Sequence, residues 1–348
     1  MSSENNYTAS KHYLSIDVLN ILACFSVIIL HCSGCVTTFK KTAAWGVSLF
    51  LQTVAYWAVA AFFMISGATL LGYRKKYSTI IFLKKRFQHV ILPFLLWSTI
   101  YLFYNSFILH WYSLPSLKDS IYLFLNNKIV YIFYFFYDLI GIYFIVPVVS
   151  ILAEDRYKKL LCGTIILEFF AIMVRRDFVL LTKINITGYF EIPLMTGYMC
   201  FFLAGWYLFH YDLTLLHKKI LYALGIASFV FMFSFTFIRS YQLNKLYDSV
   251  RSYFSICNFF MATSVFVFIK NINFEKRFSV PFAHRVKILS SASFGVYLVQ
   301  MIYLPIASKL FQTYSVAYLL LAPIVIYTIC VATVLIVKKI PVIKYIFP

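Results

Sequence analysis

Long apolar segments that recur along the whole chain are the feature that most restricts its fold. Each segment is close to 20 residues long and ends in a polar cluster, as a hydrocarbon layer about 30 Å thick requires of a spanning helix. The short alternating segments of a transmembrane barrel are not seen in the sequence. We therefore predict an all-α, polytopic integral membrane protein with about ten transmembrane helices and no soluble domain. The expected helices cover 14–33, 45–72, 87–111, 129–152, 159–174, 189–209, 220–239, 253–270, 288–311 and 316–337.

The distribution of positive charge indicates which way the chain crosses the membrane. The formal net charge is +19, and with a cytoplasmic N-terminus the cytoplasmic segments hold 20 of the 31 Lys and Arg residues. The positive-inside rule supports this orientation, with both termini in the cytoplasm. The most basic loops, 73–86 and 271–287, suit anionic membrane lipids or a phosphorylated cytosolic ligand better than nucleic acid.

The predicted organisation is a cytoplasmic tail at 1–13, a transmembrane domain at 14–337 and a second cytoplasmic tail at 338–348. The seven cysteines show no metal-binding spacing, so no metal is expected. Cys32 and Cys35 form a C-x-x-C at the outer end of the first predicted helix. This pair is either a redox motif or two small residues packed within a membrane helix.

A narrow polar stripe runs along the first predicted helix. At 100° per residue, Asp17, Asn20, Cys24 and His31 fall within an arc of roughly 60°, and they span about 21 Å. Such a stripe faces a partner helix or a wet cavity rather than lipid, because polar groups at bilayer depth are costly. His31 is therefore either a functional imidazole or a group that hydrogen-bonds a neighbouring helix.

Three acidic residues also fall within or beside the predicted helices: Asp138, Glu168 and Glu191. Each could serve as a proton relay, as an anchor for an acceptor hydroxyl, or as a counter-charge to a basic group such as Arg239. For each of them a purely structural role is the alternative.

Five stretches, in order along nearly the whole chain, carry recognisable motifs. They are Tyr13–His31; Phe62–Gly67, which reads FF-x-x-SG; Lys84–His89 followed by Pro93 and Trp97; Tyr137–Tyr143; and Ser293–Gln300. Together they resemble the acyltransferase 3 family of bacterial membrane O-acyltransferases.

The resemblance implies a ten-helix domain in the bacterial plasma (inner) membrane that takes an acyl group, usually acetyl, from cytosolic acyl-CoA. The acceptor would be a hydroxyl of a surface polysaccharide or of its lipid-linked oligosaccharide precursor, and no cofactor would be permanently bound. The expected catalytic residues are His31, Asp17 and Asn20. The expected acetyl-CoA-binding residues are Lys84, Lys85, Arg86, His89 and Ser66, and the expected acceptor-binding residues are Asp138, Tyr137, Glu191 and Gln300. His31 would act as a general base or would carry the acyl group covalently.

The chain departs from the family pattern at several positions. Asn20 stands where a basic residue usually precedes the histidine, so no charge is supplied there. His89 replaces the second basic residue of the third-helix motif, and Gln300 stands where many members have histidine. Ile132 and Tyr134 replace a His and a Trp that many members have before the Tyr137–Tyr143 motif. Two alternative functions stay open: a non-enzymatic exporter or flippase of a glycan or acylated sugar, and an ion-coupled transporter.

Overall fold

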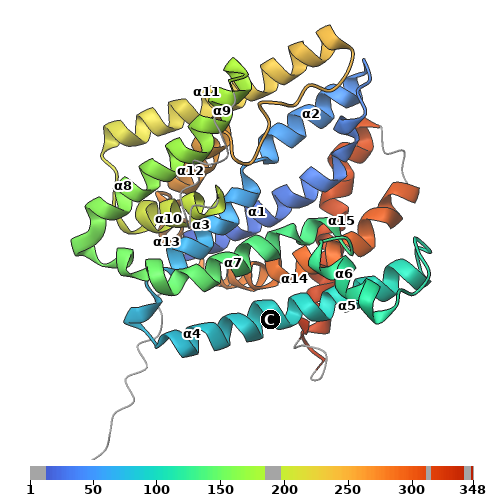
Figure 1. The fold of residues 1–348 in the computed structure, drawn as a ribbon, viewed down its shortest axis with the longest axis horizontal. Helices are drawn as coiled ribbons and strands as arrows, with labels where there is room; N and C mark the ends of the chain where they lie inside the picture. Colours follow the sequence, from blue (N-terminus) through green and yellow to red (C-terminus); the bar gives the residue numbers. More distant parts are fainter. Residues whose placement is uncertain (1–12, 185–196, 311–314, 341–345, 348) are drawn as a thin grey trace, which may run out of the picture.

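The computed structural model describes residues 13–184, 197–310, 315–340 and 346–347. These residues form helices and loops, with no strand among them, so the predicted all-α fold is confirmed (Figure 1). The helices are α1 Leu14–Cys32, α2 Ala43–Ala55, α3 Ala58–Leu70, α4 Thr79–Arg86, α5 Leu92–Phe107, α6 Leu117–Leu125, α7 Tyr134–Val149, α8 Lys158–Glu168, α9 Arg175–Thr182, α10 Gly197–His210, α11 Leu215–Leu243, α12 Ile256–Lys270, α13 Phe274–Arg277, α14 Val280–Leu310 and α15 Val316–Val337.

Seven helical segments of the described chain are long and apolar enough to cross a membrane. They are Leu14–Cys32, Ala43–Lys75, Thr79–Phe107, Tyr131–Ala153, Leu215–Leu243, Val280–Lys309 and Val316–Val337. The predicted spans 159–174, 189–209 and 253–270 are not among them, and 189–209 lies partly outside the described residues. The polytopic membrane architecture is confirmed, whereas a count of ten spans is not.

Helix α1 lies within the bundle, where it contacts α2, α3, α12, α14 and α15 (Figure 1). It runs parallel to α14. The amide Nδ2 of Asn20 lies 3.0 Å from the carbonyl oxygen of Ser290, and Sγ of Cys24 lies 3.5 Å from that of Ser293. The two residues of the first pair are 270 positions apart in the sequence and those of the second pair are 269 apart. Because this separation hardly changes, the two helices run in the same direction and stay in register over this stretch. Asn20 and Cys24, the middle of the polar stripe of α1, thus face a partner helix.

Helices α3 and α10 pack with their backbones almost in contact. A Cβ atom on Gly67 would lie 1.7 Å from the carbonyl oxygen of Phe202, and one on Gly205 would lie 2.1 Å from that of Met64. Small residues permit such close approach between membrane helices. The glycine of the FF-x-x-SG motif therefore has a packing role, while Ser66 beside it is left to face the interior.

Two interruptions shape the helices around the site. The predicted helix 45–72 is interrupted between α2 and α3. There the N–H of Tyr56 bonds the carbonyl three residues earlier, that of Thr53, at 3.3 Å, as in a 3₁₀ turn. Between α4 and α5, residues Phe87–Ile91 form a π-helical turn. Pro93 explains it, because its ring has no N–H and crowds the carbonyl of His89 four residues earlier.

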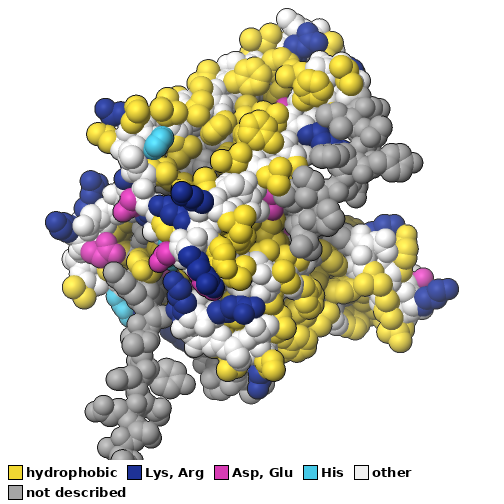
Figure 2. All heavy atoms as spheres, turned by 60° about the vertical axis from the view of Figure 1, so that its left-hand side comes forward, with side chains coloured by type: hydrophobic (Ala, Val, Ile, Leu, Met, Phe, Trp, Pro, Cys, Tyr) yellow, Lys and Arg dark blue, Asp and Glu magenta, His cyan; other side chains and the backbone are white. Residues whose placement is uncertain are grey.

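One end of the bundle is strongly basic, and we call it the basic end. Nζ of Lys270 bonds the carbonyl of Leu208 and the carboxylate of Asp212, which brings the ends of α10 and α12 together. Tyr13, at the start of α1, packs on Phe209 at 4.8 Å between ring centroids. Figure 2 turns this side forward and shows Lys and Arg side chains at many places on it. The opposite end, where α1 finishes, is called the His31 end.

Candidate active site

A first cavity, of about 350 Å³, lies beside Asn20 and is called the inner cavity. Its polar lining consists of Asn20, Ser66, Arg86, His89, Tyr143, Ser290, Ser293 and Tyr297. Four of the predicted residues, Asn20, Ser66, Arg86 and His89, are thus brought together from α1, α3 and the α4–α5 junction. The remaining lining is apolar and comes mostly from α3, α7 and α14.

Arg86 supplies the positive charge of the inner cavity. Its guanidinium carbon lies 5.8 Å from the ring centroid of Phe82 and 5.7 Å from that of Tyr143, so the cation is held between two aromatic side chains. Its Nε is buried and makes no hydrogen bond within the described structure. A guanidinium with a spare donor is suited to binding a carboxylate or phosphate oxygen.

The two lysines before Arg86 extend this basic region. Lys84 and Arg86 both line a neighbouring cavity of about 300 Å³, which shares Tyr143 with the inner cavity. Nζ of Lys85 lies 4.2 Å above the ring of Tyr77. Both lysines are exposed, so their charges act on a ligand through solvent.

Asn20 uses its amide to join two helices. Nδ2 donates to both the carbonyl oxygen and the hydroxyl of Ser290, at 3.0 and 3.1 Å. The residue therefore positions α14 at the cavity wall, and it brings no charge to the place where the family usually has a basic side chain.

His31 lines a second cavity, of about 440 Å³, which we call the outer cavity. Its Nδ1 lies 3.0 Å from the hydroxyl of Tyr131, and which atom donates depends on the imidazole tautomer. The two rings meet edge to face, with centroids 5.8 Å apart. The hydrogen bond fixes the orientation of the imidazole and turns its Nε2 away from Tyr131.

The segment that carries Tyr131 is held by three side chains, two of them on helices α5 and α14 and one within the segment itself. Nδ2 of Asn105 donates to the carbonyl of Ile129 at 2.8 Å, and Nδ2 of Asn127 donates to that of Tyr131 itself at 2.9 Å. The hydroxyl of Tyr297 donates to the carbonyl of Ile132. These bonds keep Tyr131 at a defined place over His31.

The two cavities lie along the same pair of helices. Asn20 and His31 are eleven residues apart on α1, which corresponds to about 16 Å along the helix axis. On α14, Tyr297 lines the inner cavity and Met301, one turn later, lines the outer one. Tyr297 therefore stands between the two cavities, and its hydroxyl reaches the residue that follows Tyr131.

The structure does not gather every predicted residue at these cavities. Asp17 is buried three residues before Asn20 but does not line the inner cavity. Gln300 is only 1% exposed, its Nε2 donates to the carbonyl of Tyr297 at 3.2 Å, and it lines neither cavity. The hydroxyl of Tyr137 donates to the carbonyl of Phe124.

The acidic residues that the sequence singles out are dispersed. Asp138 is exposed on α7, Glu168 is buried at the end of α8, and Glu191 lies outside the described residues. Neither of the two described carboxylates lines the inner or the outer cavity.

Sequence reasoning missed most of the α14 contribution and Tyr131. Ser290, Ser293 and Tyr297 recur at spacings of three and four residues, which places them on one helical face. That pattern is visible in the sequence, but only the contact with α1 shows that this face borders a cavity. Tyr131 carries no comparable signal, because a single tyrosine near a loop is common in membrane proteins.

Helices α1 and α14 thus line two cavities of a multi-pass membrane protein, one that contains Arg86 and one that contains an oriented histidine. The acyltransferase domain model of the acyltransferase 3 family matches residues 13–338, nearly the whole chain. The chain belongs to this family, and the protein is a membrane acyltransferase. No curated protein and no solved structure gives a significant match to it.

Proposed function

We propose that the protein moves an acetyl or other short acyl group from acyl-CoA to a hydroxyl of a cell-surface polysaccharide or of its lipid-linked precursor. The observation that carries the proposal is the placement of two cavities along α1 and α14, with Arg86 in the inner one and His31 in the outer one. The basic end then faces the cytoplasm of a bacterial inner membrane, with both termini on that side.

The inner cavity suits the acyl donor. Coenzyme A is a polyanion, and Arg86, with Lys84 and Lys85 nearby, concentrates positive charge where a ligand enters from the basic end. Ser66 and His89 add hydrogen-bonding groups to the same wall. From there the acyl arm extends past Tyr297 toward His31, a path of about 16 Å along α1.

The outer cavity suits the acceptor. Tyr131 and Tyr318 provide aromatic surface, and Ser308 provides a hydroxyl at its wall. A smaller cavity of about 260 Å³, which shares Tyr131 with it, adds Trp111 and Lys128. Aromatic faces beside polar groups are typical of a surface on which a sugar can stack.

His31 serves as the general base. When its Nδ1–H donates to the Tyr131 oxygen, Nε2 presents a lone pair. Nε2 accepts the proton of the acceptor hydroxyl as that oxygen bonds to the acyl carbonyl carbon. The carbon–sulfur bond then breaks, and the imidazolium returns the proton to the departing thiolate.

A covalent route differs at one point. Here Nε2 itself bonds to the acyl carbon and the carbon–sulfur bond breaks, which gives an acyl-imidazolium and the coenzyme A thiolate. In a second step the acceptor oxygen bonds to the acyl carbon, the carbon–nitrogen bond breaks to restore the neutral imidazole, and the hydroxyl proton passes to the thiolate. Brief incubation with labelled acetyl-CoA and no acceptor separates the routes, because only the covalent one leaves label on His31.

The test is acyl transfer or hydrolysis by purified protein with radiolabelled acetyl-CoA. We compare wild type, His31→Ala and His217→Ala, the last as a control because His217 is exposed at the start of α11. Turnover in wild type and His217→Ala that is lost in His31→Ala supports the proposal. Equal turnover in all three proteins excludes His31 from the chemistry. Absence of both turnover and acetyl-CoA binding in wild type would favour the exporter alternative.

A further inference from the structure

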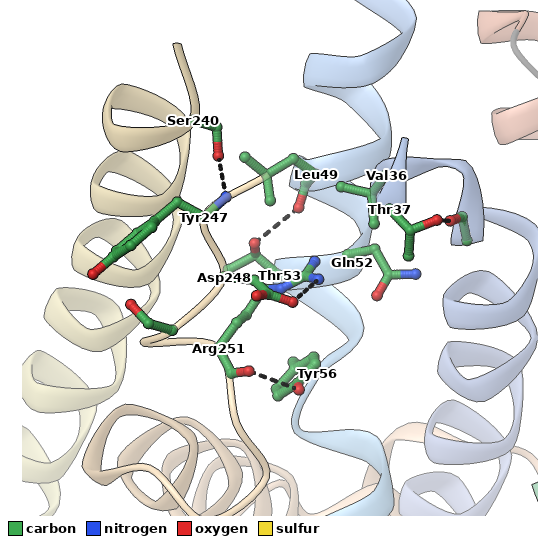
Figure 3. Close-up of polar contacts among 12 residues, drawn as sticks. Val36, Thr37, Leu49, Gln52, Thr53, Tyr56, Ser240, Tyr247, Asp248 and Arg251 are labelled. Carbon is green, nitrogen blue, oxygen red and sulfur yellow. Dashed lines mark hydrogen bonds and ion pairs between the residues drawn. The ribbon is translucent and has the colours of Figure 1, made fainter. Parts of the chain in front are cut away.

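Arg251 is a buried cation that the proposed chemistry does not use. It lies in the segment between α11 and α12, which runs into the bundle beside α2 (Figure 3). Its side chain is only 7% exposed. Its Nε and Nη1 are buried without any hydrogen-bond partner in the described structure, and Nη2 lies 3.7 Å from the Asp248 carboxylate, a loose ion pair. Because buried polar groups are nearly always bonded, two orphaned donors on one guanidinium require an explanation.

The backbone around Arg251 is held in place without its guanidinium. The N–H of Tyr247 bonds Oγ of Ser240 at 2.9 Å, and the hydroxyl of Tyr56 donates to the carbonyl of Arg251 at 3.2 Å (Figure 3). Arg176 donates to the carbonyl of Ser249. The charged group is therefore not the fastening that keeps this segment in the bundle.

Two other arginines show what a structural arginine looks like in this protein. Arg74 donates through Nε to the Ser150 hydroxyl at 2.6 Å and through Nη2 to the carbonyl of Pro147 at 2.8 Å. Arg176 pairs with Asp177 and also bonds the backbone. Arg251 is more buried than Arg176 and has fewer partners, although a buried charge whose donors are not satisfied is costly.

Stacked aromatic rings lead from Arg251 to Tyr134, at the start of α7. Its guanidinium carbon lies 5.8 Å from the ring centroid of Tyr56, which stacks on Tyr253 at 4.6 Å. Tyr253 in turn stacks on Tyr134 at 6.5 Å. Tyr134 is one helical turn after Tyr131, the partner of His31. Arg251 and His31 thus lie at the two ends of a row of tyrosines.

We propose that Arg251 binds an acidic group, a carboxylate or a phosphate, carried by the glycan acceptor whose hydroxyl is acylated at His31. A guanidinium stays charged at every physiological pH and presents a planar set of donors that carboxylates and phosphates match. An anion at this position satisfies the orphaned Nε and Nη1 and neutralises the buried charge. This inference rests on the proposed function and adds to it that the acceptor is acidic.

The test is binding of small probes to the full-length protein in detergent, without acyl-CoA. The probes are methyl glucuronide, glycerol 1-phosphate and the neutral methyl glucoside, and their dissociation constants are obtained by ligand-observed NMR. The proteins are wild type, Arg251→Gln, Arg251→Lys and Lys245→Gln. Lys245 is an exposed lysine of the same segment, so Lys245→Gln removes one positive charge without touching the buried site.

We expect wild type and Lys245→Gln to bind at least one acidic probe at least tenfold more tightly than methyl glucoside. Arg251→Gln should lose this preference, and Arg251→Lys, which keeps the charge but not the planar fork, should retain part of it. The tighter of the two acidic probes identifies the acidic group as carboxylate or phosphate. If Arg251→Gln does not fold, Arg251→Lys takes its place. A preference for acidic probes that is weaker than in wild type then supports the inference, and an unchanged preference overturns it.

Equal binding of acidic and neutral probes to wild type overturns the inference, as does an unchanged preference in Arg251→Gln. An equal loss in Lys245→Gln also overturns it, because general surface charge would then explain the effect. Acetyl-CoA turnover is measured separately on the same preparations. If turnover depends on His31 but Arg251 gives no preference for acidic probes, this inference alone is refuted. If Arg251 binds acidic probes but wild type neither turns over nor binds acetyl-CoA, the transferase proposal is refuted.

Discussion

The Nδ1 atom of His31 and the hydroxyl of Tyr131 lie 3.0 Å apart, although the two residues are separated by 100 positions in the chain. The bond joins the end of α1 to the segment that precedes α7. It leaves Nε2 as the nitrogen available to a substrate, and it makes the orientation of the imidazole dependent on a residue outside α1.

Replacing Tyr131 should therefore impair catalysis more than donor binding. For Tyr131→Phe we expect kcat to fall roughly tenfold, because the imidazole loses the partner that sets its orientation. The KM for acetyl-CoA should change little, since Tyr131 lines the outer cavity and not the inner one. Steady-state kinetics give both values. Tyr122→Phe, at an exposed tyrosine of α6, is the control, and an equal loss in that variant would contradict the prediction.

Removing the charge of Arg86 should weaken donor binding. For Arg86→Gln we expect the KM for acetyl-CoA to rise roughly tenfold, or about 1.4 kcal/mol, because a half-buried cation in the inner cavity is lost. Lys84→Gln should have a smaller effect, since Lys84 is exposed and its charge is screened. Titrations at low and high salt measure this, and a larger effect for Lys84 would show that the inner cavity is not the donor site.

Restoring a basic residue at position 20 should strengthen donor binding. In Asn20→Lys a cation enters the inner cavity, although the bond to Ser290 is lost at a cost of about 1 kcal/mol of stability. We expect a KM for acetyl-CoA several-fold below that of Asn20→Ala, which loses the same bond without gaining charge. Equal KM values in the two variants would mean that position 20 does not face the donor.

The close contact between α3 and α10 should tolerate no added methyl group. For Gly67→Ala we expect the free energy of unfolding to fall by about 1–3 kcal/mol or more, because the new Cβ would lie 1.7 Å from the backbone oxygen of Phe202. Gly163→Ala is the matched control, since nothing lies within 4 Å of a Cβ built there. Thermal unfolding followed by size-exclusion chromatography in detergent compares them. A Tm for Gly67→Ala equal to that of Gly163→Ala would argue against this packing.

Much of the fold could be predicted from hydrophobicity alone, because a helix that crosses a hydrocarbon layer must be long and apolar whatever its neighbours are. The interruption between α2 and α3 could not be predicted in this way, since the sequence around Tyr56 is as apolar as that of an uninterrupted helix. At this point the chain makes a tertiary contact: the hydroxyl of Tyr56 donates to the backbone carbonyl of Arg251, 195 residues away.

The candidate site was likewise predictable from the sequence only in part. The stripe of Asp17, Asn20, Cys24 and His31 follows from the period of one helix, and the motifs of the sequence pointed to Ser66, Arg86 and His89. The expectation that Gln300 belongs with them depended on a motif position alone, and the structure turns its side chain to the backbone of its own helix instead of to a cavity.

By itself, the sequence determined the membrane-spanning helical architecture, the basic segments and the family, because each depends on the order of residues along one segment or motif. Only the tertiary structure decided that Asn20 and His31 open into two different cavities, that Tyr131 orients His31, and that Arg251 is buried with unsatisfied donors. These facts depend on which helices meet and in what register. That choice is made by packing between segments hundreds of residues apart, which no local pattern encodes.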